Sequence, residues 1–266
     1  MAEPTDRDRA VWASLATRGY LATGHPSHGE ADHAEGVVPA PAAEAPSEGT
    51  LREAVLALQR RYRLPETGEV DVALEAFLLA PHCGVPDPAS AIDPELAGLD
   101  LIEATGAGRW LKLELTYQFM SWPPGLAVAG VRQAFRNACT TWEQACALRF
   151  REVAAGGDMR IHFGARNHGD PWPFDGRERT LAHAFYPNWK YPLNGDIHVD
   201  TDEIWSVSDN APGGSKDLES VFLHEIGHAI GLEHVNNTRS VMFANYAGIV
   251  RTLFAADSSR IRAIYG

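Results

Sequence analysis

The sequence predicts two parts of different fold class, a helical module over residues 1–80 and an α/β domain over residues 109–266. Apolar residues recur at helical spacing through the first part. In the second part, short stretches of alternating polarity are interleaved with long amphipathic stretches, a pattern typical of strands and helices packed together. Domains commonly hold about 100–200 residues, so a chain of 266 residues can accommodate both parts.

Three short helices account for the first part. The first spans about residues 7–21. The second follows a helical stripe and stops before Pro65, because the residue that precedes a proline disfavours the helical conformation. Its stripe consists of Leu51, Val55, Leu58 and Tyr62. The third begins after Asp71, an expected N-cap. Its apolar residues are Leu74, Phe77 and Leu78.

Two further segments of the chain look irregular. Residues 22–49 contain almost no large apolar side chain and are rich in Gly, Pro, Ala, Glu and His, so we expect a flexible insertion within the helical module. Residues 81–108 begin with Pro- and Gly-rich sequence and predict a connecting segment between the two parts.

The α/β part begins near Arg109. Residues 111–117 alternate Leu or Tyr with Lys, Glu and Thr, which predicts a strand. A long amphipathic helix follows over about residues 131–146, and short β-type runs occupy residues 148–153 and 159–163. Beyond them comes a loop-like stretch rich in His, Asp and Gly.

Composition excludes several classes of function. Hydrophobic residues make up 45% and charged residues 22%, as in ordinary globular proteins. The formal net charge of −12 argues against nucleic acid as a partner, because phosphate binding needs a basic face. No apolar run of about 18 residues predicts a membrane span. Three cysteines are too few for a disulfide scaffold, and we expect Cys139 and Cys146 to be buried free thiols on one helix.

The strongest chemical signal is the run from His224 to His234, which reads H-E-x-x-H-x-x-G-x-x-H. On a helix, His224 and His228 project from one face and can hold one zinc ion. Gly231 allows a positive φ, so the chain can leave the helix and bring His234 round as a third ligand. Three protein ligands leave one position open for water, the arrangement of a catalytic zinc site.

Glu225 lies beside a ligand but points elsewhere, so it can act as general base toward water on the zinc. Zinc lowers the pKa of that water to about 7, which permits attack on a peptide carbonyl. The preceding residues support the helix, with Ser215 or Asp217 as the candidate N-cap. The motif therefore predicts hydrolysis of amide bonds without a covalent intermediate.

With these residues the sequence resembles the metzincin zinc endopeptidases, and within them the matrix metalloproteinases, or matrixins. Ser240-Val241-Met242-Phe243 resembles the family's Met-turn, which makes Met242 the residue beneath the zinc. The resemblance implies an α/β (α+β) catalytic domain with a twisted, mixed five-stranded sheet and three helices. It also implies a small peptidoglycan-binding-like prodomain over residues 1–80, and we expect no hemopexin domain.

The resemblance extends over residues 168–205, which are similar to the matrixin metal-binding segment. It implies a structural zinc site whose ligands are His168, Asp170, His183 and His198. It implies calcium sites whose ligands are Asp175, Gly176, Asp200 and Glu203, with Asp158 and Asp196 at a second calcium. Carboxylate and carbonyl oxygens suit calcium, and a four-ligand protein site suits structural zinc.

Residues 181–185 resemble the family's edge strand, which pairs with an extended polypeptide substrate. The expected substrate contacts are Leu181, Ala182, Ala184 and Tyr246. An unpaired strand edge can accept a peptide as an additional strand. Ala244 stands where the family commonly has Pro, which changes the expected wall of the S1′ pocket.

Pro81-His82-Cys83-Gly84-Val85-Pro86-Asp87 resembles the matrixin cysteine switch, in which a propeptide thiolate occupies the open zinc position. Cys83 would then be an inhibitory ligand, and an activating protease would release it. His82 stands where the family usually has Arg, so we expect looser, pH-dependent latency. The resemblance implies a secreted, extracellular monomer, although the N-terminus shows no basic and apolar signal segment.

Two other interpretations compete with a latent endopeptidase. In one, the N-terminal module binds peptidoglycan and the zinc domain cuts peptide cross-links of the cell wall. In the other, the metals stabilise a scaffold that has no enzymatic turnover. Cys83 in a switch-like context argues against the first, and Glu225 argues against the second, because a structural zinc site has no use for an uncoordinated carboxylate.

Overall fold

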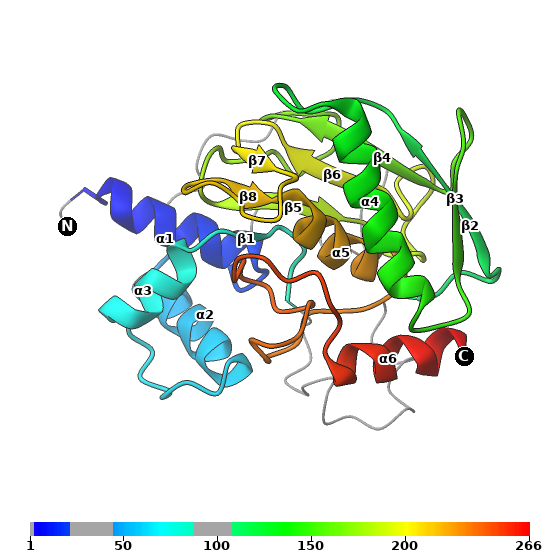
Figure 1. Ribbon diagram of the computed structural model, residues 1–266. Coiled ribbons are helices and arrows are strands. Elements are labelled where there is room, and N and C mark those ends of the chain that lie inside the picture. Colours follow the sequence, from blue (N-terminus) through cyan, green and yellow to red (C-terminus); the bar gives the residue numbers. More distant parts are fainter. Residues whose placement is uncertain (1–2, 22–44, 88–107) are drawn as a thin grey trace.

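The N-terminal module consists of three helices around one small apolar core (Figure 1). The computed structural model describes residues 3–21, 45–87 and 108–266. The helices are α1 (Asp6–Thr17), α2 (Glu48–Arg61) and α3 (Val72–Leu79). One fully buried leucine from each helix meets in the core, namely Leu15, Leu58 and Leu78.

Local capping explains where these helices begin. Asp71 accepts a hydrogen bond from the backbone N–H of Leu74, so the predicted N-cap of α3 is confirmed. Ser47 does the same for Thr50, and α2 therefore starts at Glu48. The expected flexible insertion over residues 22–49 is wrong at its C-terminal end, because its last two residues are helical. Residues 22–44 of that insertion lie outside the described residues.

A six-stranded sheet combines five strands of the C-terminal part with one short strand from the connecting segment. In spatial order the strands are β1 (His82–Cys83), β5 (Thr180–Ala184), β6 (Ile197–Asp200), β4 (Met159–Gly164), β2 (Glu114–Phe119) and β3 (Arg149–Glu152). All neighbouring pairs run parallel except β5 and β6, which are antiparallel. The predicted mixed five-stranded sheet is therefore confirmed, and β1 lies on the outer edge of β5.

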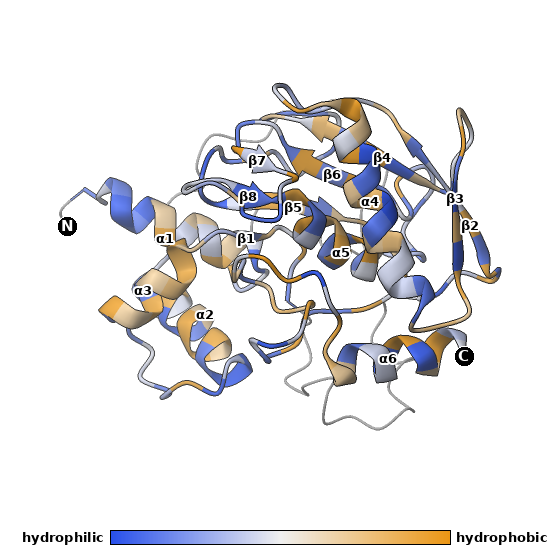
Figure 2. Cartoon of the chain, viewed as in Figure 1, coloured by the Kyte–Doolittle hydropathy of each residue, from blue (hydrophilic) through white to orange (hydrophobic). Residues whose placement is uncertain are grey.

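Three helices complete the C-terminal part, as the sequence predicts: α4 (Val128–Glu143), α5 (Leu218–Ala229) and α6 (Ala255–Tyr265). Helices α4 and α5 pack side by side over the sheet (Figure 1). The fully buried indole of Trp142 donates a hydrogen bond to the Leu223 carbonyl and so ties α4 to α5. Strand β6 and helix α3 contain much orange in Figure 2, and Ile197 and Val199 of β6 and Leu74 and Leu78 of α3 are buried in the cores of the two parts.

Cys139 and Cys146 are both buried free thiols, as expected. Helix α4 ends at Glu143, however, so Cys146 lies just beyond the helix and only Cys139 lies on it.

The predicted strand over residues 111–117 is shifted toward the C-terminus. Pairing with β3 begins where the backbone N–H of Arg149 donates to the Leu113 carbonyl, and the first residue of β2 with a partner on β3 is Glu114. Leu111 is 94% exposed, because the alternating pattern continues upstream of the point where a partner strand exists. Trp110 instead turns inward, and its indole donates to the Ala229 carbonyl at the end of α5.

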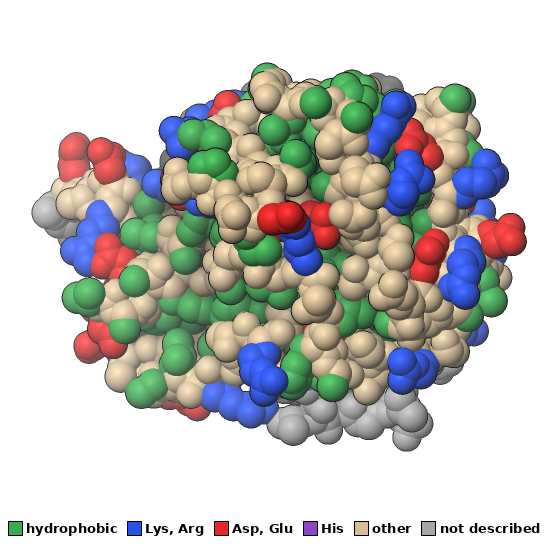
Figure 3. All heavy atoms as spheres, viewed as in Figure 1, with side chains coloured by type: hydrophobic (Ala, Val, Ile, Leu, Met, Phe, Trp, Pro, Cys, Tyr) green, Lys and Arg blue, Asp and Glu red, His purple; other side chains and the backbone are tan. Residues whose placement is uncertain are grey.

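Two short strands, β7 (Trp205–Ser206) and β8 (Lys216–Asp217), pair just before α5. On the face shown in Figure 3, acidic and basic side chains are interspersed and form no continuous basic patch. Among the described residues, no helix has both the length and the apolar character needed to cross a membrane.

Candidate metal centre

Helix α5 carries the first two histidines of the motif. Asp217 caps it by accepting hydrogen bonds from the backbone N–H and the hydroxyl of Ser220, as one of the two predicted caps. The helix ends at Ala229, and Gly231 has a φ of +101°, which lets the chain turn sharply. A side chain at Gly231 would also collide with the Gly108 carbonyl oxygen, so only glycine fits. The turn brings His234 back toward α5.

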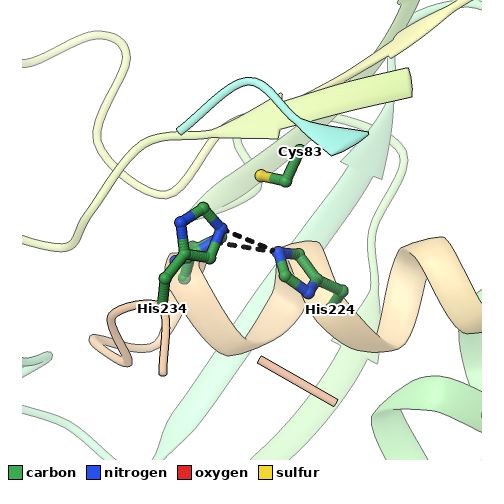
Figure 4. Close-up of side chains that lie close together, drawn as sticks. Cys83, His224 and His234 are labelled. Atoms are coloured by element: carbon green, nitrogen blue, oxygen red, sulfur yellow. Dashed lines mark hydrogen bonds between the residues drawn. The ribbon is translucent and has the colours of Figure 1, made fainter. Parts of the chain in front are cut away.

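The three imidazoles converge through their Nε2 atoms. Figure 4 shows two of them, His224 and His234, next to Cys83. Nε2 of His224 lies 3.1 Å from Nε2 of His228 and 3.2 Å from Nε2 of His234. The Nδ1 atom of His224 faces the Val241 carbonyl at 2.6 Å, and that of His228 faces the Leu232 carbonyl at 2.7 Å. A carbonyl only accepts, so Nδ1 carries the proton in both rings and each Nε2 presents a lone pair.

Lone pairs that face one another at this distance repel unless a cation lies between them. Ligand nitrogens about 2.0–2.1 Å from a tetrahedral zinc ion would lie about 3.3 Å apart, close to the spacing observed. Burial, followed by the neighbouring His234, lowers the pKa of His224 to about 3, so this ring is neutral as a metal ligand must be. The donor set and its spacing therefore fit zinc.

Cys83 completes this group from the connecting segment. Its Sγ and the three histidine nitrogens all lie within 4.8 Å of one another, and all four residues are buried. Burial and the neighbouring Glu225 raise the pKa of the Cys83 thiol well above its ordinary value. A thiolate is thus unfavourable here unless a cation offsets its charge, which is again the environment expected at a metal site.

Met242 forms the floor of the site. Its side chain is fully buried, and its sulfur packs so closely on α5 that a side chain at Gly227 would overlap it. The Met242 backbone N–H donates to the hydroxyl of Ser240, which in turn is hydrogen-bonded to the buried carboxylate of Asp257 at the start of α6. The structure thus places Met242 directly beneath the helical turn that carries the two histidines.

Glu225 lies on α5 beside the Cys83 thiol and is 1% exposed. Burial is the main cause that raises the pKa of its carboxyl to about 8. Its Oε2 atom has no hydrogen-bond partner within the described parts of the chain. A buried carboxylate with a free oxygen next to the fourth ligand position can take up a proton from a group bound there.

The part of the connecting segment that the structure describes, residues 81–87, runs between β5 and the loop after Met242. The backbone N–H of Gly84 donates to the Ala182 carbonyl at 2.7 Å, on the β5 side. On the other side, the N–H of Cys83 donates to the Ala244 carbonyl at 2.9 Å, and the N–H of Tyr246 donates to the Pro81 carbonyl at 2.8 Å. The segment therefore fills the space in front of the histidines and covers the outer edge of β5.

Contacts from the helical module reach the same site. The guanidinium of Arg61 donates to the His234 carbonyl at 2.6 Å, and that of Arg18 donates to the Asn245 side chain at 2.6 Å. The Asp87 carboxylate accepts from Nδ1 of His234 at 3.0 Å. Burial opposes ionisation of Asp87, but the hydrogen bond from His234, the charge of Arg18 and the hydrogen bond from Tyr20 favour the carboxylate, and the pKa of Asp87 is lowered to about 2. Arg61, Arg18 and Asp87 come from segments distant from the motif, so no pattern in the sequence predicts these roles.

A second cluster joins His168, Asp170, His183 and His198. One oxygen of Asp170 lies 2.6–3.1 Å from a ring nitrogen of each histidine. Burial opposes ionisation of Asp170, yet the three histidines hold its pKa well below the usual range. His183 and His198 sit directly opposite each other on β5 and β6. The predicted structural-zinc residues are therefore brought together, with three nitrogen donors and one oxygen donor.

Three of the predicted calcium ligands are partly satisfied carboxylates. One oxygen each of Asp175, Asp200 and Glu203 accepts a backbone N–H. The second oxygens of Asp200 and Glu203 are buried and have no partner within the described chain. Burial raises the pKa of all three carboxyls, that of Asp200 to about 6. Gly176 turns with a φ of +91° beside them. Neighbouring buried carboxylates that have an oxygen without a hydrogen-bond partner, such as those of Asp200 and Glu203, fit a hard cation such as calcium.

The structure places the other two predicted calcium residues differently. Asp158 is ion-paired with Lys112 at 2.6 Å and accepts from the backbone and hydroxyl of Thr116. Asp196 forms a two-pronged ion pair with Arg160. Both carboxylates are thus paired with cationic side chains. The second calcium, which at Asp196 would involve the backbone carbonyl, stays a prediction.

A pocket opens beside His224, the first of the three histidines. Leu181, Tyr246 and Glu225 are among the residues that line it, together with Cys83 of the connecting segment. The Tyr246 hydroxyl accepts from the backbone N–H of Asp217 at 2.7 Å, which fixes the ring in the wall. Two of the four predicted substrate contacts thus line the pocket, and Ala182 and Ala184 lie on the adjoining strand β5.

Fold and site together define a zinc-dependent metallopeptidase. Residues 109–266 match the family model described as Matrixin. The chain is 36% identical to matrix metalloproteinase-26 of Homo sapiens, over 79% of this chain and 76% of that protein. It is 35% identical to matrix metalloproteinase-C of Caenorhabditis elegans, over 83% of this chain and 38% of that protein. It is 34% identical to macrophage metalloelastase of Rattus norvegicus, over 81% of this chain and 44% of that protein.

The chain belongs to the matrixin family. The predicted family is therefore confirmed, and with it the class of metalloendopeptidase and the use of zinc and calcium. The chain spans less than half of the length of the nematode and rat relatives.

Replacing Gly227 by Ala should destabilise the fold even though Ala favours helix by about 1 kcal/mol. The added methyl group would overlap the Met242 sulfur and approach Trp142 to 3.1 Å, where both side chains are fully buried. Overpacking of this kind costs about 1–3 kcal/mol. Urea unfolding would measure it, with Gly213→Ala, which meets no atom within 4 Å, as the control.

A double-mutant cycle identifies the cause. Because the most severe overlap is with the Met242 sulfur, Gly227→Ala combined with Met242→Ala should be less destabilising than the sum of the two single changes. Additive effects would show that Met242 does not form the floor beneath this glycine.

Proposed function

We propose that this chain is a latent zinc endopeptidase that cleaves extended polypeptides. The observation that carries the proposal is the convergence of three Nε2 lone pairs with the Cys83 thiol at one buried point. In the proposed arrangement His224, His228 and His234 hold zinc, and Cys83 is the inhibitory fourth ligand. The zinc would supply a Lewis acid that lowers the pKa of water and polarises the scissile carbonyl.

Glu225 performs the proton transfers in the proposed reaction. Once Cys83 has left, its buried carboxylate faces the position that the thiol occupied. It accepts the proton of the attacking water as the new C–O bond forms. It then donates that proton to the amide nitrogen as the C–N bond breaks, so the carboxylate is regenerated. Met242 and Gly227 keep the helix that carries Glu225 in place.

Strand β5 positions the substrate. Removal of the connecting segment would free the Ala182 and Ala244 carbonyls that now accept from Gly84 and Cys83. An extended peptide could use the same groups and place a side chain in the pocket beside Leu181 and Tyr246. The connecting segment and the substrate therefore compete for one set of hydrogen-bonding partners, which explains latency beyond the loss of the fourth ligand position.

Residues 1–80 act as a prodomain in this proposal, and an activating protease would cut the connecting segment. His82 is buried, and burial followed by the charge of Arg18 lowers its pKa well below the ordinary value. Its Nε2 atom has no partner within the described chain, so it makes no ion pair of the kind that Arg could make. The looser latency expected from His82 stays a prediction.

The remaining metal assignments are also proposals. His168, Asp170, His183 and His198 would bind structural zinc, and Asp175, Gly176, Asp200 and Glu203 would bind calcium. We infer extracellular action on matrix polypeptides, as a monomer, because relatives are named matrix metalloproteinases and calcium is abundant outside cells. Those names support this inference over the peptidoglycan-directed alternative.

Glu225→Gln should abolish peptide hydrolysis when it is introduced into the Cys83→Ser variant, in which the inhibitory thiol is absent. The amide cannot accept the proton of water, so the rate should fall by about 10²–10⁴-fold while zinc stays bound. A quenched fluorescent peptide and metal analysis measure the two quantities. Glu219→Gln is the matched control, since Glu219 lies on the same helix but contacts Asn137 and Arg251. Equal rates for Glu225→Gln and its parent would refute the proposed base.

Cys83→Ser should make the intact chain active without a thiol reagent. A serine hydroxyl is a poorer zinc ligand than a thiolate, and losing that bond should raise activity at least about tenfold. Cys146→Ser is the control, because Cys146 is buried just after α4 and hydrogen-bonds to the Trp142 carbonyl. That variant should stay latent until a mercurial is added. A Cys83→Ser chain as silent as wild type would contradict the switch.

Calcium should stabilise the chain through Asp200. After treatment with a calcium-selective chelator, calcium at 100 times its dissociation constant should add about 2.7 kcal/mol and raise the unfolding midpoint. Asp200→Asn should lose most of that increase. Asp158→Asn should keep it, because Asp158 is ion-paired with Lys112. The reverse pattern would place the calcium at Asp158, where the sequence resemblance also allowed one.

A further inference from the structure

The partner of His234 differs in origin from those of the other two histidines. His224 and His228 each donate through Nδ1 to a carbonyl of the C-terminal part. His234 donates to the carboxylate of Asp87, at 3.0 Å, across 147 residues of sequence. Asp87 belongs to the connecting segment, four residues after Cys83. The third histidine is therefore oriented by a residue that leaves when the segment leaves.

Asp87 is itself held firmly by the helical module. The hydroxyl of Tyr20, just after α1, donates to its Oδ2 at 2.8 Å. The hydroxyl of Tyr62, at the end of α2, lies 2.9 Å from Oδ2 and 3.1 Å from Oδ1. The Asp87 backbone N–H donates to the Arg18 carbonyl. Its side chain is 2% exposed and that of His234 is 1% exposed, so solvent does not compete for this contact.

A buried carboxylate that accepts from Nδ1 of a metal-binding histidine has two effects. It fixes the ring and its tautomer with Nε2 directed at the metal, and it makes that nitrogen more basic. Carbonyl partners orient a ring as well, but they carry no net charge. Among the three zinc-directed histidines, only His234 has an anionic partner in the described structure.

We propose that Asp87 is a positioning residue for the zinc site. Through its contact with His234, the helical module and connecting segment strengthen zinc binding in the latent chain, in addition to blocking the site with Cys83. This inference rests on the proposed three-histidine zinc site. Coupling between two binding events is reciprocal, so bound zinc also tightens the docking of the helical module. Removal of the segment then yields an open site that holds zinc less tightly than the latent one.

The test measures zinc release from the intact, zinc-loaded chain to a chromogenic chelator. Because two zinc sites are present in the proposal, the relevant phase is the one that disappears in His228→Ala. Asp87→Asn keeps the size of the side chain and removes its charge. It should speed that phase by about tenfold or more, as loss of outer partners of zinc-binding histidines does. Asn245→Ala, which removes contacts with Arg18 and the Phe77 carbonyl but touches no zinc-directed histidine, should change it less than about twofold.

A second background separates Asp87 from Cys83. In Cys83→Ser chains the thiolate is absent, and Asp87→Asn should accelerate release by a similar factor. Cobalt in place of zinc gives a further readout, since the visible spectrum reports the ligand field, and it should shift in Asp87→Asn but not in Asn245→Ala. Should Asp87→Asn fail to fold, Tyr62→Phe removes one donor to the same carboxylate and should accelerate release in the same direction, by less.

Unchanged release and an unchanged cobalt spectrum in Asp87→Asn would overturn the inference while the proposed function stands. The same holds if Asn245→Ala accelerates release as much as Asp87→Asn does, because general undocking would then be the cause. Failure of the proposed function has another signature, in which the wild-type chain shows no release phase that depends on His228.

Discussion

The convergence of three uncharged imidazole nitrogens on one buried point is the constraint on which the rest of the structure depends. Lone pairs about 3 Å apart repel, so each ring must be held from behind by a hydrogen bond to Nδ1. The partners at Val241 and Leu232 belong to the loop that leaves α5, and that loop can return only because Gly231 adopts a positive φ. Met242 then fills the space beneath the turn. Helix α5, the turn at Gly231 and the packing of Met242 thus together hold the three Nε2 atoms at one position.

The helical module docks on that same point. Its guanidinium at Arg61 bonds the His234 carbonyl, its tyrosines hold Asp87 against the His234 ring, and the connecting segment brings in Cys83. Aromatic contacts of Phe243 with Tyr62 and Phe77 extend the interface beside the Met-turn loop. In the proposed zymogen, latency therefore depends on more than the Cys83 thiol. It is distributed over contacts that each involve a zinc-directed histidine or the loop next to it.

Much of this arrangement could be predicted from the sequence, because the relevant patterns are local. The spacing of His224, His228 and His234 with Gly231 predicts a helix, a turn and a ligand set within eleven residues. Asp71 and Asp217 likewise indicate where α3 and α5 begin. The contacts of Asp87, Arg61 and Arg18 could not be predicted this way. They join residues 147, 173 and 227 positions apart, and no local periodicity encodes which distant group a buried charge will meet. The strand predicted to include Leu111 fails for a related reason. Its alternating pattern is local, but a strand also needs a partner, and pairing with β3 starts only at Glu114.

The metal clusters away from the active site have a mechanical consequence for it. His183 lies on β5 and His198 opposite it on β6, so a metal held by both would tie β5, the proposed substrate-binding strand, to its neighbour by more than backbone hydrogen bonds. Asp175 accepts from the backbone N–H of Thr180 at the start of β5, and Asp200 ends β6. Because the two strands are antiparallel, the start of β5 and the end of β6 lie at the same end of the pair, so the carboxylates anchor that end while the two histidines join the strands within their paired stretch. In the proposed function, β5 exchanges the connecting segment for a substrate without itself moving. Because β1 of the connecting segment occupies one edge of β5, the strand is best fixed along the opposite edge, where His183 and His198 join it to β6.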